Sequence, residues 1–166
     1  MFISRLATRR TWHATTHVRG RPEEVLAALT DPAACARWSG VAFTLRGHDG
    51  PRLTTGSRAR VTGELAGRSV DFDLSVLEAD PHRLRLCAIG PVQLVATYLL
   101  APTDDGCQVD AALTVVPAAI PHGGVIAFGT QALLAAGALE QALARLAVEV
   151  EGDRRPAAVE YRRSAA

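Results

Sequence analysis

GGVIAFGTQALLAAGALEQALARLAVEVE, residues 123–151, is the segment that decides the fold of this 166-residue chain. Apolar residues recur in it at alternating intervals of three and four, which predicts one buried face of an α-helix. At 1.5 Å per residue, a single helix over this segment would be roughly 40 Å long. Such a helix needs a large apolar surface to lie on. The residues of the stripe are Val125, Phe128, Ala132, Ala135, Leu139, Leu143, Leu146 and Val150.

The chain before this segment is expected to supply that surface as a sheet. After the first strand, two short helices are predicted over residues 22–30 and from 32 through Trp38, each with a proline at its first position. Consecutive hairpins then give a seven-stranded antiparallel sheet with one apolar face, curled around the long helix. The predicted fold class is therefore α+β. The strands are expected over residues 11–18, 41–46, 58–62, 69–74, 82–89, 92–100 and 108–116.

Two of these strands carry alternating charged and apolar residues, and this alternation predicts their register. Folding the chain about Leu65–Ala66 places Arg60 opposite Asp71 and Arg58 opposite Asp73. One face of the hairpin then pairs charges in water, and the other face is wholly apolar. A slip by one residue would bury the charges, so the alternation predicts this register.

Composition excludes several kinds of chemistry. All 18 basic residues are arginine, which excludes Schiff-base catalysis, a pyridoxal-phosphate anchor and a Walker-type lysine. A net charge of +1 gives no indication of a nucleic-acid partner. The three cysteines have no metal-motif spacing and are expected to be small, mostly buried hydrophobes in a reducing compartment. We therefore expect neither a metal nor a cofactor.

The ends of the chain and its uncharged stretch indicate where the protein resides. The N-terminal residues MFISRLATRR lack the apolar run of a signal peptide. No charge occurs between residues 111 and 139, but Pro117, Pro121 and Gly123–Gly124 interrupt this stretch, which argues against membrane insertion. We expect a cytoplasmic monomer or homodimer, with one domain over residues 1–151 and a flexible tail over 152–166.

Several segments together resemble the START/polyketide-cyclase (SRPBCC) superfamily over about residues 11–151. They are RPEEVLAALTDPAACARW (21–38), GSRARVTGELAGRSVDFDLSVLEADP (56–81), the strand pair around Gly90–Pro91, the DDG turn (104–106) and the C-terminal helix. The resemblance implies the helix-grip fold. It is not specific for a function, because members include polyketide cyclases and aromatases, lipid and sterol carriers, hormone receptors and chaperone-activating domains.

The resemblance also implies a cavity between the sheet and the C-terminal helix that takes a small to medium hydrophobic molecule. Small residues on the predicted inner surface agree with a cavity, although alanines also allow a helix to pack close to a sheet. The residues expected to contact the ligand are Trp38, Ala59, Val61, Phe72, Leu74, Leu86, Ala96, Tyr98, Ala111, Leu113, Phe128 and Ala132.

Few residues are candidates for catalysis. Tyr98 is expected to point inward, Glu140 lies at the edge of the helical stripe, and His122 precedes the long helix near the expected mouth. His13 and His17 lie on one strand, about 13 Å apart, too far to share a metal ion. We therefore favour binding of a lipid, quinone or polyketide-like molecule. The alternatives are a polyketide cyclase or aromatase and, third, a chaperone-activator-type interaction module.

Overall fold

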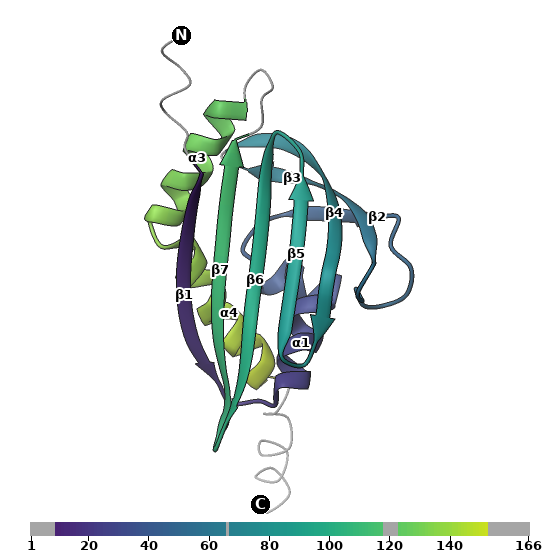
Figure 1. Ribbon diagram of the computed structural model, residues 1–166, viewed down its shortest axis with the longest axis vertical. Coiled ribbons are helices and arrows are strands. Elements are labelled where there is room, and N and C mark those ends of the chain that lie inside the picture. Colours follow the sequence, from purple (N-terminus) through teal and green to yellow (C-terminus); the bar gives the residue numbers. More distant parts are fainter. Residues whose placement is uncertain (1–8, 66, 118–122, 153–166) are drawn as a thin grey trace, which may run out of the picture.

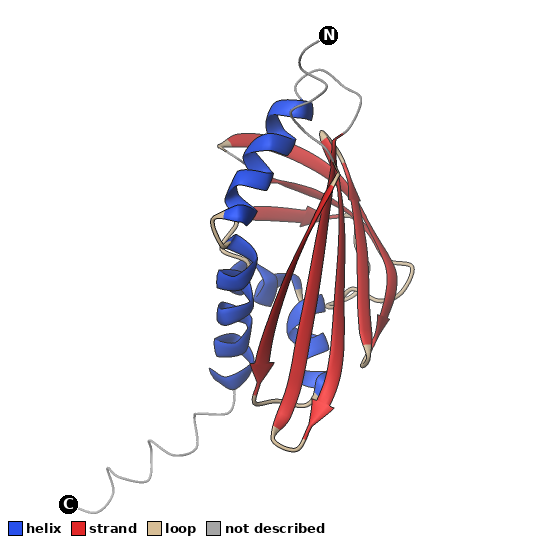
Figure 2. Ribbon diagram, turned by 60° about the vertical axis from the view of Figure 1, so that its left-hand side comes forward, coloured by secondary structure: helices blue, strands red, loops and turns tan. Residues whose placement is uncertain are grey.

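The computed structural model describes residues 9–65, 67–117 and 123–152. Its elements in chain order are β1 (Arg10–Val18), α1 (Pro22–Thr30), α2 (Pro32–Trp38), β2 (Phe43–Arg46), β3 (Arg58–Leu65), β4 (Arg68–Asp80), β5 (Arg83–Ile89), β6 (Val92–Thr103), β7 (Gly106–Pro117), α3 (Gly123–Ala135) and α4 (Ala138–Gly152). The strands form one antiparallel sheet in the order β1-β7-β6-β5-β4-β3-β2. The helices lie on one face of this sheet (Figures 1 and 2). The predicted α+β class and the seven-stranded sheet are confirmed.

The two short helices begin and end where the sequence predicts. Pro22 and Pro32 occupy the first helical positions, where a missing N–H removes no hydrogen bond. Asp31 separates the helices and accepts a hydrogen bond from the backbone N–H of Ala33 at 3.0 Å, which caps α2. The chain therefore reverses sharply between α1 and α2, and both helices remain on the inner face of the sheet.

The predicted pairing of β3 with β4 is wrong by two residues. Arg60 lies opposite Asp73, and Thr62 lies opposite Asp71. The reason is Gly67, whose φ of 75° is the left-handed conformation that tight hairpin turns favour, so the chain turns one residue later than predicted. A shift of two keeps every side chain on its predicted face, because side chains alternate with a period of two.

The long C-terminal helix is interrupted, whereas the sequence predicts a continuous one. Gly137 has a φ of 97°, which lies outside the right-handed helical region, so the helix is interrupted there. Glycine adopts this conformation without the steric cost that other residues incur. The backbone N–H of Gly137 donates to the carbonyl of Leu134, and its own carbonyl accepts from Gln141 at the start of α4. Figure 2 shows the break as a loop between two helices. Among the described residues, no helix is long and apolar enough to cross a membrane.

The break changes which face of the helical segment is buried. In α4 the predicted stripe is confirmed, with Leu139, Leu143, Leu146 and Val150 buried. In α3 the prediction is wrong, since Ala132 and Ala135 are exposed. Among the α3 side chains that the structure describes, the buried ones are instead Ile126, Ala127, Thr130, Gln131 and Leu134. Because α3 is apolar on nearly every side, its pattern identified no unique face.

The helices divide the inner face of the sheet among them. α4 packs on β1 and on the two short helices, and α3 packs on β7, β6, β1 and β3. α1 contacts β4, β6 and β7, so it lies between α4 and the middle of the sheet. α1, α3 and α4 therefore all pack directly on the inner face of the sheet, with α4 along its β1 edge and α1 nearer its middle (Figure 1).

Candidate ligand-binding cavity

Apolar side chains at the centre of the inner face remain partly exposed. Near the ends of the strands this face is fully buried, as at Leu84, Val92, Leu100 and Val115. In the central part it is only half-buried, although these residues face the helices. The half-buried residues are Val61, Leu74, Leu86, Ala88, Leu94, Ala96, Tyr98 and Leu113. Protein interiors are normally close-packed, so this pattern indicates space between sheet and helices.

The first space lies between α2 and the sheet, and we call it the α2 cavity. Its volume is about 170 Å³. α2 and the adjoining ends of its neighbours supply Leu29, Pro32, Cys35, Trp38 and Ser39. The opposite wall comes from five strands and the β2–β3 loop, namely Phe43, Leu45, Leu53, Val61, Leu74, Leu86 and Tyr98. None of these side chains is charged.

The second space, the β2 cavity, has a volume of about 280 Å³. It shares Phe43, Val61 and Leu74 with the α2 cavity, so the two lie side by side along the inner face. Its other lining residues are Val41, Gly63, Glu64, Val70, Phe72, Ala88 and Leu94. We call the two cavities together the apolar site. An apolar lining with few polar groups is typical of sites that bind small hydrophobic molecules.

Three of the four polar side chains in the α2 cavity are bonded to the backbone. The Cys35 thiol donates to the carbonyl oxygen of Leu29, with Sγ and O 3.2 Å apart. The indole Nε1 of Trp38 donates to the carbonyl of Ala28 at 3.0 Å. The Ser39 hydroxyl accepts from the backbone N–H of Val41 at 3.3 Å. These bonds stabilise the end of α2 and leave these groups little capacity for a ligand.

The fourth polar side chain is Tyr98. Its side chain is half-buried against the inner face of the sheet, and the loss of water around the phenol raises its pKa above the usual range. Burial likewise raises the pKa of the neighbouring Cys35 thiol to about 12. Both groups are therefore protonated at neutral pH. Within the described residues, no group forms a hydrogen bond with the Tyr98 hydroxyl.

Six of the twelve residues expected to contact a ligand lie around this space. Trp38, Val61, Phe72, Leu74, Leu86 and Tyr98 line the apolar site. Ala96, Ala111 and Leu113 occupy the same face of the sheet but do not line either cavity. Ala59 lines a neighbouring crevice among Arg46, Arg58 and Arg60. Ala132 is exposed on α3, and the side chain of Phe128 lies outside what the structure describes.

The helix that lines the cavity opposite the sheet is not the one that the sequence suggested. The sequence suggested a space between the sheet and the C-terminal helix, but no described residue of α3 or α4 lines either cavity. The wall is α2, whose Pro32, Cys35 and Trp38 recur at intervals of three and thus share one helical face. That spacing could have identified this face of α2 from the sequence. Leu53 had no such signal, because it lies in an irregular loop that is held by core packing and by a hydrogen bond from its N–H to the carbonyl of Thr30 at 2.9 Å.

The other catalytic candidates do not meet at the apolar site. Glu140 is exposed on α4, and His122 lies outside the described residues. His13 and His17 are exposed on the outer face, where the Nε2 atom of His17 lies 3.0 Å from the carboxylate of Asp105. Of the catalytic candidates that the structure describes, only Tyr98 lines the cavity.

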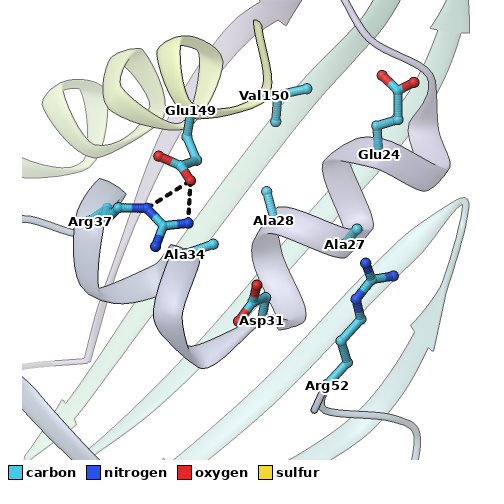
Figure 3. Close-up of a pocket in the computed structure, with 9 residues that line it drawn as sticks. All are labelled: Glu24, Ala27, Ala28, Asp31, Ala34, Arg37, Arg52, Glu149 and Val150. Carbon is cyan, nitrogen blue, oxygen red and sulfur yellow. Dashed lines mark hydrogen bonds and ion pairs between the residues drawn. The ribbon is translucent and has the colours of Figure 1, made fainter. Parts of the chain in front are cut away.

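A charged crevice of about 330 Å³ lies on the other side of α2, between α1, α2 and α4. Figure 3 shows its carboxylates and guanidinium groups around a floor of three alanines. Arg37 on α2 donates to Oε1 of Glu149 on α4 through Nε and Nη2, at 2.9 and 2.6 Å. This ion pair links α2 to α4 and so supports the wall of the α2 cavity from behind. The charged lining of the crevice does not suit a hydrophobic molecule.

The family model for polyketide cyclase/dehydrase and lipid transport proteins matches residues 9–151 of the chain. That match covers every strand and helix described above except the last residue of α4. A search of functionally curated proteins found no match.

Solved structures with this architecture come from several bacteria. The Zhui aromatase/cyclase from Streptomyces sp. R1128 is similar at a TM-score of 0.69 and 17% identity, over 90% of this chain and 98% of that one. Protein CV1439 from Chromobacterium violaceum is similar at a TM-score of 0.65 and 25% identity, over 86% and 98%. TTHA0849 from Thermus thermophilus is similar at a TM-score of 0.65 and 19% identity, over 87% of this chain and 99% of that one. The helix-grip architecture is thereby confirmed.

Proposed function

We propose that this chain, which belongs to the polyketide cyclase/dehydrase and lipid transport family, binds a small hydrophobic molecule in its apolar site. The observation that carries the proposal is the α2 cavity, which lies between α2 and the sheet and whose lining contains no charged side chain. Half-buried leucines and valines around it would lose their contact with water once a ligand enters. This burial favours binding by about 25 cal/mol per Å² of apolar surface.

The volumes of about 170 and 280 Å³ favour a compact ligand. Drug-sized ligands occupy pockets of about 300–1,000 Å³, so the apolar site is at the lower end of that range. A bicyclic aromatic molecule or a short alkyl chain is of suitable size. Affinity is expected to be on the order of micromolar, because association costs offset much of the gain from burial.

Binding is favoured over the cyclase alternative by the protonation of the cavity's polar groups. Cyclisation or dehydration needs a group that exchanges protons near neutral pH. The two titratable side chains in the lining of the α2 cavity, Cys35 and Tyr98, have pKa values raised by burial and hold their protons there. Glu64 lines the β2 cavity and is exposed, and Glu140 is exposed and lines neither cavity.

The test is to fill the site. Val61 lines both cavities, so Val61→Trp is expected to weaken binding of ethylnaphthalene, followed by its fluorescence, at least tenfold. Leu77→Trp is the matched control, since Leu77 is 49% exposed and lines neither cavity. Ala88→Leu in the β2 cavity is a milder second variant should Val61→Trp unfold the sheet.

Equal affinities of the wild type, Leu77→Trp and a folded filled variant would show that the molecule binds elsewhere. Circular dichroism of each variant establishes that the sheet is intact. No saturable binding by the wild type would also contradict the proposal.

A further inference from the structure

Tyr98 occupies a fixed position at the base of the α2 cavity. Its neighbours across the sheet are Leu84 on β5 and Ala111 on β7. Both are buried, with 0% and 4% of their surface exposed, so they hold the β6 backbone in place. The phenol therefore enters the cavity from a rigid strand, the kind of support that precise binding groups require.

The Tyr98 hydroxyl is the polar group of the α2 cavity that remains available to a ligand. The side chains of Cys35, Trp38 and Ser39 are already bonded to backbone groups. Covering an O–H donor without giving it a partner costs about 1–3 kcal/mol. A purely hydrocarbon ligand would incur this cost, whereas a ligand oxygen placed against the hydroxyl would avoid it.

The charges around the apolar site disfavour an anionic ligand. A carboxylate moved from water into an apolar site needs a cation or several donors beside it. The arginines near the inner layer line other crevices, Arg37 and Arg52 on the charged side of α2 and Arg46, Arg58 and Arg60 beside Ala59. Arg145 on α4 lies against Gly40 and is not among the residues that line either cavity. The charged side chain that does line the β2 cavity is Glu64, which would repel an anion.

From these observations we infer that the apolar site selects an uncharged molecule with one hydrogen-bond-accepting oxygen, such as a ketone, which accepts the hydrogen bond of Tyr98. The inference rests on the proposed function and adds the chemical class of the ligand. It makes Tyr98 a specificity-determining residue of the binding site.

Three probes of nearly equal shape separate the possibilities. Acetylnaphthalene carries a neutral acceptor, ethylnaphthalene has no polar group, and naphthoate is an anion at neutral pH. For the wild type we expect acetylnaphthalene to bind about threefold to tenfold tighter than ethylnaphthalene, the gain of one hydrogen bond. Naphthoate is expected to bind at least about tenfold more weakly than acetylnaphthalene.

The decisive variant is Tyr98→Phe, which keeps the ring and removes the hydroxyl. It is expected to abolish the preference for acetylnaphthalene by raising the affinity for ethylnaphthalene about threefold to tenfold above that of the wild type, because the hydrocarbon then covers no unpaired O–H donor. Thr97→Val is the matched control, because Thr97 precedes Tyr98 on β6 and its side chain lies on the opposite face of the sheet, so the loss of its hydroxyl is expected to preserve the preference. Competition of acetylnaphthalene with ethylnaphthalene establishes that both occupy one site.

The outcomes distinguish this inference from the proposed function. If ethylnaphthalene binds but Tyr98→Phe retains the ketone preference, or naphthoate binds as tightly as the ketone, the inference is wrong and the proposed function stands. If none of the three probes binds the wild type, both are wrong. Should Tyr98→Phe fail to fold, equal affinity of the wild type for ketone and hydrocarbon still overturns the inference.

Discussion

At the scale of single residues, the apolar site depends on two protonated side chains that face one cavity. Tyr98 enters from the sheet and Cys35 from α2, and burial raises the pKa of both groups. The thiol is bonded to a backbone carbonyl and the phenol is not. The two residues therefore differ in role, since Cys35 stabilises the end of α2 and Tyr98 remains available to a ligand.

The raised pKa of Cys35 predicts a loss of stability in alkali. The thiol has an ordinary pKa of 9.0 and a folded-state pKa of about 12, so between these values the folded state keeps a proton that the unfolded state releases. The free energy of unfolding therefore falls as pH rises from about 9 to about 12, by on the order of 1 kcal/mol per pH unit from this group. Urea unfolding across this range should show a shallower decline for Cys35→Ala. Identical slopes for the two proteins would contradict the assignment.

Sequence reasoning could identify Tyr98 and Trp38 because an aromatic residue on a predicted inner face has few alternatives to burial. It could not identify Cys35 or Leu53 as lining residues. A small cysteine fits many environments, and Leu53 lies in an irregular loop that is held by core packing and by a hydrogen bond to the end of α1. Ala132 was placed at the site because its helical phase was extrapolated from α4.

At the scale of elements, the break between α3 and α4 controls how the inner face is covered. It allows α3 to present Ile126 and Leu134 to the sheet while α4 presents Leu143 and Leu146. The leucine stripe of α4 was predictable because charged residues mark its outer side. The face of α3 was not, because this helix lacks charged residues and its apolar residues surround its axis.

The φ of 97° at Gly137 predicts a specific cost of substitution. Gly137→Ala is expected to lower the free energy of unfolding by about 1–2 kcal/mol, since an L-residue is strained in this conformation. Gly152→Ala is the control, because Gly152 is not among the glycines with positive φ and an added methyl there meets open space. Urea unfolding measures both. A Gly137→Ala protein as stable as the wild type would mean that the segment also folds as one continuous helix.

At the scale of the whole molecule, the site assembles segments that are distant in the sequence. α2 faces five strands, and the layer behind it is α4, joined through the Arg37–Glu149 ion pair. The sequence predicted the sheet, its apolar face and most helix boundaries, since these follow from local periodicity and turn residues. Which helix covers which strands depends on the packing of all elements together, and local patterns do not contain that information.

The most direct test of a ligand site beneath α2 is the position of a bound probe. Intermolecular nuclear Overhauser effects between ethylnaphthalene and the protein's methyl groups measure that position. We expect contacts with the methyls of Val61, Leu74 and Leu86, which line the α2 cavity. Contacts with Leu143 and Leu146 of α4 instead, or no contacts from the inner face, would contradict the account.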